Sequence, residues 1–303
     1  MFGAIREHSR HCASRWLAPL SMCLLATSSP AEPATGLTVR VAAVQCYSRM
    51  GEPEHNRQLL TSLIEQAASN AARIVVLPEC AITGYMDPAS QIIWTTNATP
   101  SSGELPIGRY AEPIPGPATE HFGGVSKRLA IYLCIALAEK ADGRFFNSQV
   151  LLTPEGKIAA HHRKRSLWAP GDGLWVSEGD RPLQVVETLY GRLGLMICHD
   201  VHLLPERLGK AKADIVLYSV GWYGPNTENW YKTIFPRKYV VPNGFSIIVS
   251  NWSADQDSSG WPGHGYSCVI DRQGRVLSMA KSQKGAEIVY ADLPTRIGLK
   301  ESL

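Results

Sequence analysis

The sequence predicts an α/β fold. Residues 38–45 form an apolar run with the pattern of a strand, residues 54–71 repeat leucine, isoleucine and alanine at helical spacing, and another apolar run begins at Arg73. This order of elements is a βαβ unit, which is typical of parallel sheets. Three short apolar runs also end in polar side chains, as strands do where they carry residues into a binding site. Both observations indicate an α/β protein with its site at the edge of a sheet.

The remaining elements follow in chain order. A stretch rich in proline and glycine at residues 99–117 predicts a long surface loop of the kind that often covers a site, and residues 119–129 predict a helix. Further strands are predicted at residues 131–138, 149–152, 157–163, 192–197, 215–219, 245–250 and 267–270. No stretch repeats and none has the composition of a linker, so we predict one catalytic domain.

The three polar endings carry the most chemical information. Glu79 follows an apolar run, Lys164 follows residues 157–163, and Cys198 closes the run that begins at Arg192. Ligands of α/β proteins usually bind beyond the ends of strands, so an acid, an ammonium and a thiol could meet at the same edge of a sheet. A thiol becomes a good nucleophile when a base removes its proton; Glu79 can be that base, and the charge of Lys164 would favour the thiolate.

These residues lie in blocks that resemble the Glu/Lys/Cys signature of the nitrilase (carbon-nitrogen hydrolase) superfamily. The three blocks occur in the family's order: Leu77-Pro78-Glu79, His162-Arg163-Lys164, and residues 194–200. Comparable flanking blocks lie at residues 146–148, 153–156, 237–251 and 265–274. The resemblance implies a four-layer α-β-β-α sandwich over residues 37–295, whose subunits pair into a homodimer or a higher homo-oligomer.

The resemblance also implies a mechanism. Cys198 would attack the substrate carbon, Glu79 would move the protons, and Lys164 with the backbone N–H of His199 would stabilise the oxyanion. This chemistry requires no metal and no organic cofactor. We therefore predict a secreted cysteine hydrolase that cleaves a non-peptide C–N bond of a small linear amide through a thioester, releasing an acid and ammonia or an amine.

Substrate binding is less clearly specified by the sequence. Many relatives carry a second glutamate between the lysine and the cysteine, and two counts along this chain place Asp172 there, while Glu178 is the nearest glutamate. His199 stands where many relatives have an aromatic residue. Trp222 and Tyr223 lie where the family builds its pocket wall, and they suggest a substrate with apolar or planar parts.

Two alternative functions compete with an amidase. One is a nitrilase that converts a nitrile to an acid and ammonia, although such enzymes resemble Cys-Trp-Glu where this chain has Cys198-His199-Asp200. The other is a catalytically silent or metal-binding secreted domain of the same fold. Zinc could bind the cluster that ends at His202, but adjacent residues on an extended strand point to opposite faces and cannot all reach one ion.

The N-terminus has the pattern of a signal peptide over residues 1–31. Arginines at positions 6, 10 and 15 precede the apolar residues 16–26, and small residues follow. We therefore expect a periplasmic or secreted protein with no membrane span. Removing residues 1–31 changes the formal charge from +3 to +1, because three arginines and one glutamate leave, so no basic surface for nucleic acid is expected.

Composition is consistent with a globular enzyme. The chain has 303 residues, of which 45% are hydrophobic and 19% charged, and this excludes a disordered chain. Two of its seven cysteines lie within residues 1–31. The other five are an odd number and lie mostly in strand-like runs, so we predict buried thiols in place of a disulfide framework.

Overall fold

A computed structural model of the chain describes residues 38–85, 93–169, 171–222, 226–254 and 265–296. Two six-stranded sheets form its centre. The first sheet has the order β14-β1-β2-β5-β6-β7 and the second has the order β13-β12-β11-β10-β9-β8. The strands of the first sheet are β14 (Glu287–Pro294), β1 (Thr38–Gln45), β2 (Ile74–Val76), β5 (Tyr132–Ala141), β6 (Arg144–Leu152) and β7 (Ile158–Arg163). Those of the second are β13 (Val276–Met279), β12 (Cys268–Ile270), β11 (Ser246–Asn251), β10 (Ile215–Val220), β9 (Gly191–Ile197) and β8 (Val185–Thr188).

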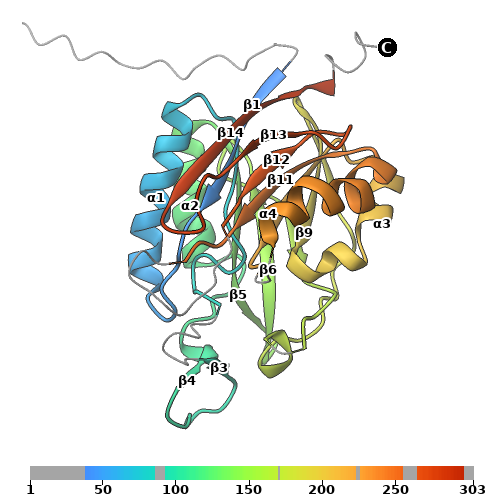
Figure 1. Cartoon of the computed structure of the whole chain (residues 1–303). Coiled ribbons are helices and arrows are strands. Elements are labelled where there is room, and N and C mark those ends of the chain that lie inside the picture. Colours follow the sequence, from blue (N-terminus) through green and yellow to red (C-terminus); the bar gives the residue numbers. More distant parts are fainter. Residues whose placement is uncertain (1–37, 86–92, 170, 223–225, 255–264, 297–303) are drawn as a thin grey trace, which may run out of the picture. The chain divides into compact units, whose positions relative to one another are not determined.

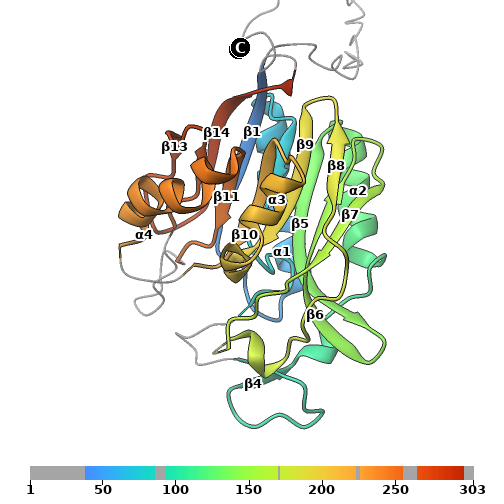
Figure 2. The same ribbon diagram turned by 90° about the vertical axis from the view of Figure 1, so that its right-hand side faces the viewer.

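Helices cover the outer face of each sheet. Helices α1 (Pro53–Ser69) and α2 (Pro117–Leu129) pack their apolar side chains on the first sheet. Helix α3 (Pro205–Lys210) and the helical segment that begins with α4 (Thr227–Asn229) pack on the second. Figures 1 and 2 show the two sheets between these helical layers. The predicted α-β-β-α sandwich is therefore confirmed.

The inner faces of the sheets form a continuous apolar core. Valine, leucine and isoleucine side chains from β1, β2, β9 and β10 fill it, and most of them are completely buried. Burying such side chains is the main favourable contribution to folding, at roughly 1.5–3 kcal/mol for each one. Alternation along β1 explains how one strand contributes to two layers, since Val41 and Ala43 face this core while Ala42 and Val44 face α1.

Hydrogen bonds between the sheets fix their relative register near the ends of the strands. The hydroxyl of Ser219 on β10 donates to the carbonyl of Leu77 at 2.7 Å, two residues before Glu79. The side-chain amide of Gln149 on β6 donates to Ser219 at 2.8 Å and to the carbonyl of Leu217 at 3.1 Å. All of these residues are buried, so these bonds hold the end of β2 opposite the end of β10.

Several elements were not predicted. The segment at residues 99–117 contains β4 (Glu104–Pro106), which pairs with β3 (Ile93–Thr95), and a short 3-10 turn (Ile107–Arg109). Strands β8, β13 and β14 were missed because their residues are largely half-exposed and their apolar runs are short. The segment after Asn226 was missed because its helical turns are irregular, with two π-helical stretches.

All five cysteines of the described chain are free thiols, as predicted. Within the described residues, no helix is long and apolar enough to cross a membrane.

Candidate active site

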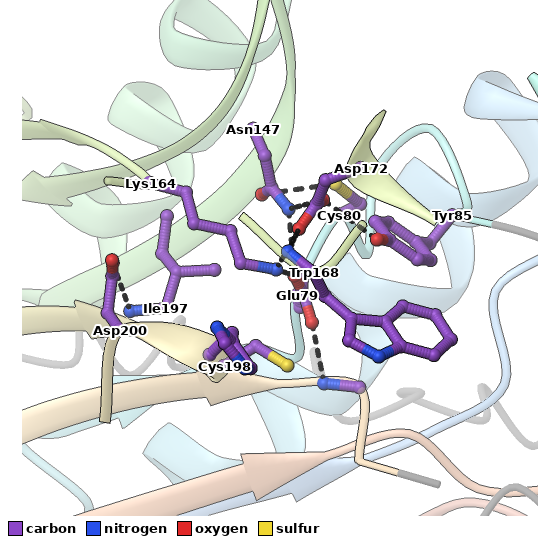
Figure 3. A network of polar contacts seen from close by, with 12 residues as sticks. Glu79, Cys80, Tyr85, Asn147, Lys164, Trp168, Asp172, Ile197, Cys198 and Asp200 are labelled. Atoms are coloured by element: carbon purple, nitrogen blue, oxygen red, sulfur yellow. Dashed lines mark hydrogen bonds and ion pairs between the residues drawn. The ribbon is translucent and has the colours of Figure 1, made fainter. Parts of the chain in front are cut away.

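The site lies where strands of both sheets end. Glu79 follows β2 and Lys164 follows β7 in the first sheet, while Cys198 directly follows β9 in the second. We expected the three residues at one edge of a single sheet, and this expectation needs correction. Each sheet contributes part of the site. The sequence could not show this, because an apolar run does not reveal which of two stacked sheets its strand joins. Figure 3 shows the three side chains converging.

Cys198 lies on a sharp turn. Its φ angle is +40°, in the left-handed region that non-glycine residues seldom adopt, and residues Cys198–His202 continue as a 3-10 helix. The hydroxyl of Tyr218 donates to the carbonyl of Cys198 at 2.8 Å and so supports the turn from beneath. The turn presents the half-buried Cys198 thiol to a pocket instead of to the core.

Lys164 is completely buried between two carboxylates. Its Nζ lies 2.7 Å from Oε1 of Glu79 and 2.7 Å from Oδ2 of Asp172 (Figure 3). Burial alone would lower the pKa of Lys164, but the negative groups around it outweigh burial and raise the pKa well above its ordinary value. The ammonium therefore remains charged. Its attraction to the two carboxylates offsets the free energy that it costs to remove these charges from water.

Glu79 is held by three donors. Its Oε1 accepts hydrogen bonds from Lys164 and from the Asn147 side-chain amide at 2.7 Å, and its Oε2 accepts one from the N–H of Gly221 at 2.8 Å. Burial raises the pKa of Glu79, Lys164 opposes this shift, and the nearby carboxylate of Asp172 adds to it. A carboxylate with a raised pKa is better suited to take a proton from a thiol and to return one later.

Asp172 occupies the second acidic position. It is completely buried, and the hydroxyl of Tyr85 donates to its Oδ1 at 2.7 Å while the N–H of Trp168 donates to its Oδ2 at 2.8 Å. The alternative residue, Glu178, is solvent-exposed, and none of its described contacts reaches Lys164. Of the two acids considered from the sequence, the structure brings only Asp172 to the lysine.

Burial decides the protonation state of Cys198. It raises the pKa of the thiol well above its ordinary value, Glu79 raises it further, and Lys164 opposes both. The sequence suggested that Lys164 would favour the thiolate, but this influence is the weaker one. Cys198 is therefore a thiol at rest, and a nearby base must remove its proton before it can attack a substrate.

Asp200 joins the segment after Lys164 to the turn at Cys198. Its Oδ1 accepts the N–H groups of Arg165 and Ser166 at 2.9 and 2.8 Å, and its Oδ2 lies 2.7 Å from Nε2 of His162. The N–H of Ile197 also donates to Oδ2, at 3.3 Å. Asp200 is completely buried, so it ties the ends of β7 and β9 together without facing the pocket.

Replacing Asp200 with alanine is expected to lower kcat by about 10²-fold with a smaller change in KM, because a displacement of ~1 Å between Lys164 and Cys198 is enough for such a loss. An asparagine at this position would keep one acceptor oxygen for the two loop N–H groups, so Asp200→Asn should retain more activity than Asp200→Ala. Steady-state kinetics with melting temperatures tests this, with Asp292→Asn on the exposed face of β14 as the control. Wild-type kcat in Asp200→Ala would contradict the assigned role.

A pocket of about 250 Å³ opens beside Cys198. It is lined by Glu79, Tyr85, Trp168, Cys198, His199, His202, Gly221 and Trp222. Two of the predicted substrate-binding residues, His199 and Trp222, therefore line it. Asp172 lies beneath Tyr85 and Trp168, to which it is hydrogen-bonded. The fourth, Tyr223, lies outside the described residues.

Several contributors to the site were not predicted. Asn147 bridges the site, since its amide donates to Glu79 and its oxygen accepts from the thiol of Cys80 at 3.3 Å. Tyr85 and Trp168 were also missed. The block that contains Asn147 was noted in the sequence, but only the pairing of β6 with β5 and β7 shows that the side chain reaches Glu79.

Comparison with known proteins identifies the family. The sequence profile of the carbon-nitrogen hydrolases matches residues 40–299. The chain therefore belongs to the carbon-nitrogen hydrolase family, within the nitrilase superfamily.

Its relatives include amidases. The chain is 27% identical over 265 residues to the omega-amidase NIT2 of Danio rerio, covering 84% of this chain and 87% of that one. It is 28% identical over 261 residues to an (R)-stereoselective amidase of a Pseudomonas species, covering 84% and 85%. These similarities support an amidase-type carbon-nitrogen hydrolase.

Solved structures of the superfamily share the fold. An amidase from Nesterenkonia sp., with the acetamide moiety of fluoroacetamide added covalently at its active-site cysteine, superposes with a TM-score of 0.70 at 21% identity, covering 89% of this chain and 98% of that one. Nit3 of Saccharomyces cerevisiae gives a TM-score of 0.68 at 21% identity, covering 88% and 93%.

Proposed function

We propose that this protein hydrolyses a small carboxamide through a thioester on Cys198, with Glu79 and Lys164 completing the catalytic triad. The observation that carries the proposal is the buried Lys164 between Glu79 and Asp172, next to a thiol presented on a strained turn. A structural core gains little from such a cluster, because buried ion pairs seldom stabilise a fold more than apolar side chains would. Clusters of perturbed pKa values in a pocket are characteristic of catalytic sites.

The first half of the reaction forms the thioester. Glu79 takes the proton of Cys198 as the sulfur attacks the carbonyl carbon, and the charge that develops on the oxygen is stabilised by Lys164 and by the N–H of His199. The protonated Glu79 then donates its proton to the leaving nitrogen. The C–N bond breaks, ammonia or an amine leaves, and the acyl group remains on Cys198.

The second half releases the acid. Glu79, again a carboxylate, takes a proton from a water molecule that attacks the thioester carbon. The C–S bond breaks, and the proton held by Glu79 returns to the sulfur of Cys198. Asp172 supports both halves from beneath the pocket, because it keeps Lys164 paired and in place.

The two alternatives are weaker for different reasons. A silent or metal-binding domain was favoured by the missing second glutamate, but Asp172 places a carboxylate against Lys164 instead. A nitrilase would use the same nucleophile, and the amidase relatives favour an amide over a nitrile.

Release of ammonia from a panel of small amides and nitriles tests the proposed function. We expect turnover of neutral carboxamides and much slower turnover of nitriles. A preparation that is folded by circular dichroism but releases no ammonia from any compound would overturn the proposal. Homodimer formation, which the family resemblance implies, is measured on the same preparation by light scattering.

We further propose that residues 1–31 are removed on export to the periplasm or the exterior. Basic, apolar and small residues follow one another there in the order typical of a signal peptide, which supports this proposal. The N-terminal sequence of the protein recovered from its native host should begin near residue 32. Active cytoplasmic protein that retains Met1 would contradict the export proposal.

A further inference from the structure

The walls of the pocket are aromatic and firmly held. The ring of Trp222 stacks on Trp230 with centroids 5.2 Å apart and an interplanar angle of 9°, and the backbone N–H of Trp222 donates to the Asn251 side chain at 2.9 Å. Trp230 in turn contacts Phe235 and Tyr239. A side chain fixed in this way presents a flat apolar surface without losing much conformational freedom when a ligand binds.

A second part of the pocket wall is fixed by Asp172. Asp172 accepts hydrogen bonds from Tyr85 and from the backbone of Trp168, and Figure 3 shows both rings on the side of the pocket toward which the Cys198 sulfur points. Gly171 leaves the room that these rings need, since a Cβ there would lie 2.6 Å from the Tyr85 hydroxyl and 2.8 Å from the Trp168 ring. The rings of Tyr85, Trp168 and Trp222 therefore all line the pocket that holds the reacting thiol.

The charges around the pocket disfavour an anionic substrate. Among its described lining residues, the only formally charged side chain is Glu79, and neither lysine nor arginine is present. Lys164 lies beneath Glu79 and is already paired with two carboxylates. A substrate carboxylate would therefore enter a site with an excess of negative charge and would find no free cation on the described walls, which makes its desolvation costly.

Two histidines, His199 and His202, also line the pocket. Their rings lie 4.6 Å apart, and Nδ1 of His199 and His202 contact Ser166 and Tyr239 at 2.8 and 3.1 Å. Burial lowers the pKa of His202, and His199 and Lys238 lower it further. A positive charge on His202 is therefore disfavoured.

We infer that the pocket selects neutral carboxamides with a planar, aromatic acyl group, and discriminates against amides that carry a carboxylate. This inference rests on the proposed amidase function. The ring would pack against the aromatic side chains of Trp222, Tyr85 and Trp168 that line the pocket. The carboxamide carbon would then face Cys198, and the NH₂ group would be near Glu79.

The test compares three substrates: benzamide, butyramide as a neutral linear amide, and succinamate as an anionic linear amide. We expect kcat/KM for benzamide to exceed that for butyramide, and to exceed that for succinamate by more than about tenfold, because an unpaired charge is costly to desolvate. Trp222→Leu should lower the benzamide-to-butyramide ratio about three- to tenfold, the usual effect of losing one aromatic contact.

Two further variants separate stacking from misfolding. Trp222→Phe keeps an aromatic face and should recover most of the ratio. Ile234→Ala, at an exposed position in the helical segment that carries Trp230, should not change it. The inference would be overturned by faster turnover of succinamate than of butyramide, or by an unchanged benzamide-to-butyramide ratio in Trp222→Leu. Either result would leave the amidase function intact. Release of no ammonia from any of the three would count against the amidase function itself.

Discussion

Replacing Cys198 with alanine is expected to abolish amide hydrolysis, with a loss in kcat of at least about 10³-fold. Without the sulfur no thioester can form, and the remaining groups can only polarise the substrate. The fold should be retained, because the side chain is half-buried at the mouth of a pocket and its removal leaves no large cavity in the core. Far-UV circular dichroism should therefore match that of the wild-type protein.

The covalent intermediate can be observed directly. Intact-protein mass spectrometry with a slowly hydrolysed amide should show one acyl adduct, and peptide mapping should place it on Cys198. Cys134→Ala is a matched control, since this thiol is buried between the sheets and its pKa is raised mainly by that burial. Labelling of Cys80 or Cys134, with activity retained in Cys198→Ala, would show that another thiol is the nucleophile.

The sequence predicted much of the fold because its strands are strongly apolar. Strand β1 was predicted with its observed bounds, and α1 and α2 were predicted to within two residues at each end, since their buried faces recur with helical or strand periodicity. Strand β14 could not be predicted in the same way. It mixes charged and apolar residues along one edge of the first sheet, where its pairing with β1 and the burial of Val289 and Leu293 stabilise it.

The sequence predicted the acids, the lysine and the thiol of the candidate site, but not the residues that hold them in place. Asp200 was noted as part of the cysteine block and of the cluster considered for zinc, but its supporting contacts were not predicted, because a motif shows the residue type and not the direction of the side chain. The structure directs it to His162 and to the backbone after Lys164. Likewise, Tyr85 reaches Asp172 across 87 residues of sequence, a contact that depends on how the loops fold over the sheet ends.

Replacing Asp172 with asparagine is expected to lower kcat by about 10²-fold or more. The carboxylate accepts from four groups, namely Lys164 and Trp168 at one oxygen and Tyr85 and Asn147 at the other. An amide can satisfy only one of these two sides, because its NH₂ group would face donors on the other. Lys164 would also lose one of its two buried partners, and an uncompensated buried charge typically costs about 3–5 kcal/mol.

The same substitution should shift the pH profile in a defined direction. Asp172 helps to raise the pKa of Glu79, so its neutralisation should lower that pKa. If Glu79 must be ionised to accept the thiol proton, the acidic limb of kcat/KM should move to lower pH in Asp172→Asn. The residual activity should nevertheless be small, because a weaker base is less able to deprotonate a thiol whose own pKa is raised.

Two further variants identify the second acid. Asp172→Glu should also impair the enzyme, since the site has no exposed surface into which an extra methylene can expand and Gly171 already packs against Tyr85 and Trp168. Glu178→Gln should change kcat little, because this side chain is exposed. A fully active Asp172→Asn alongside an inactive Glu178→Gln would mean that Glu178 is the second acid, and that the close packing around Asp172 serves only to hold Lys164 in the fold.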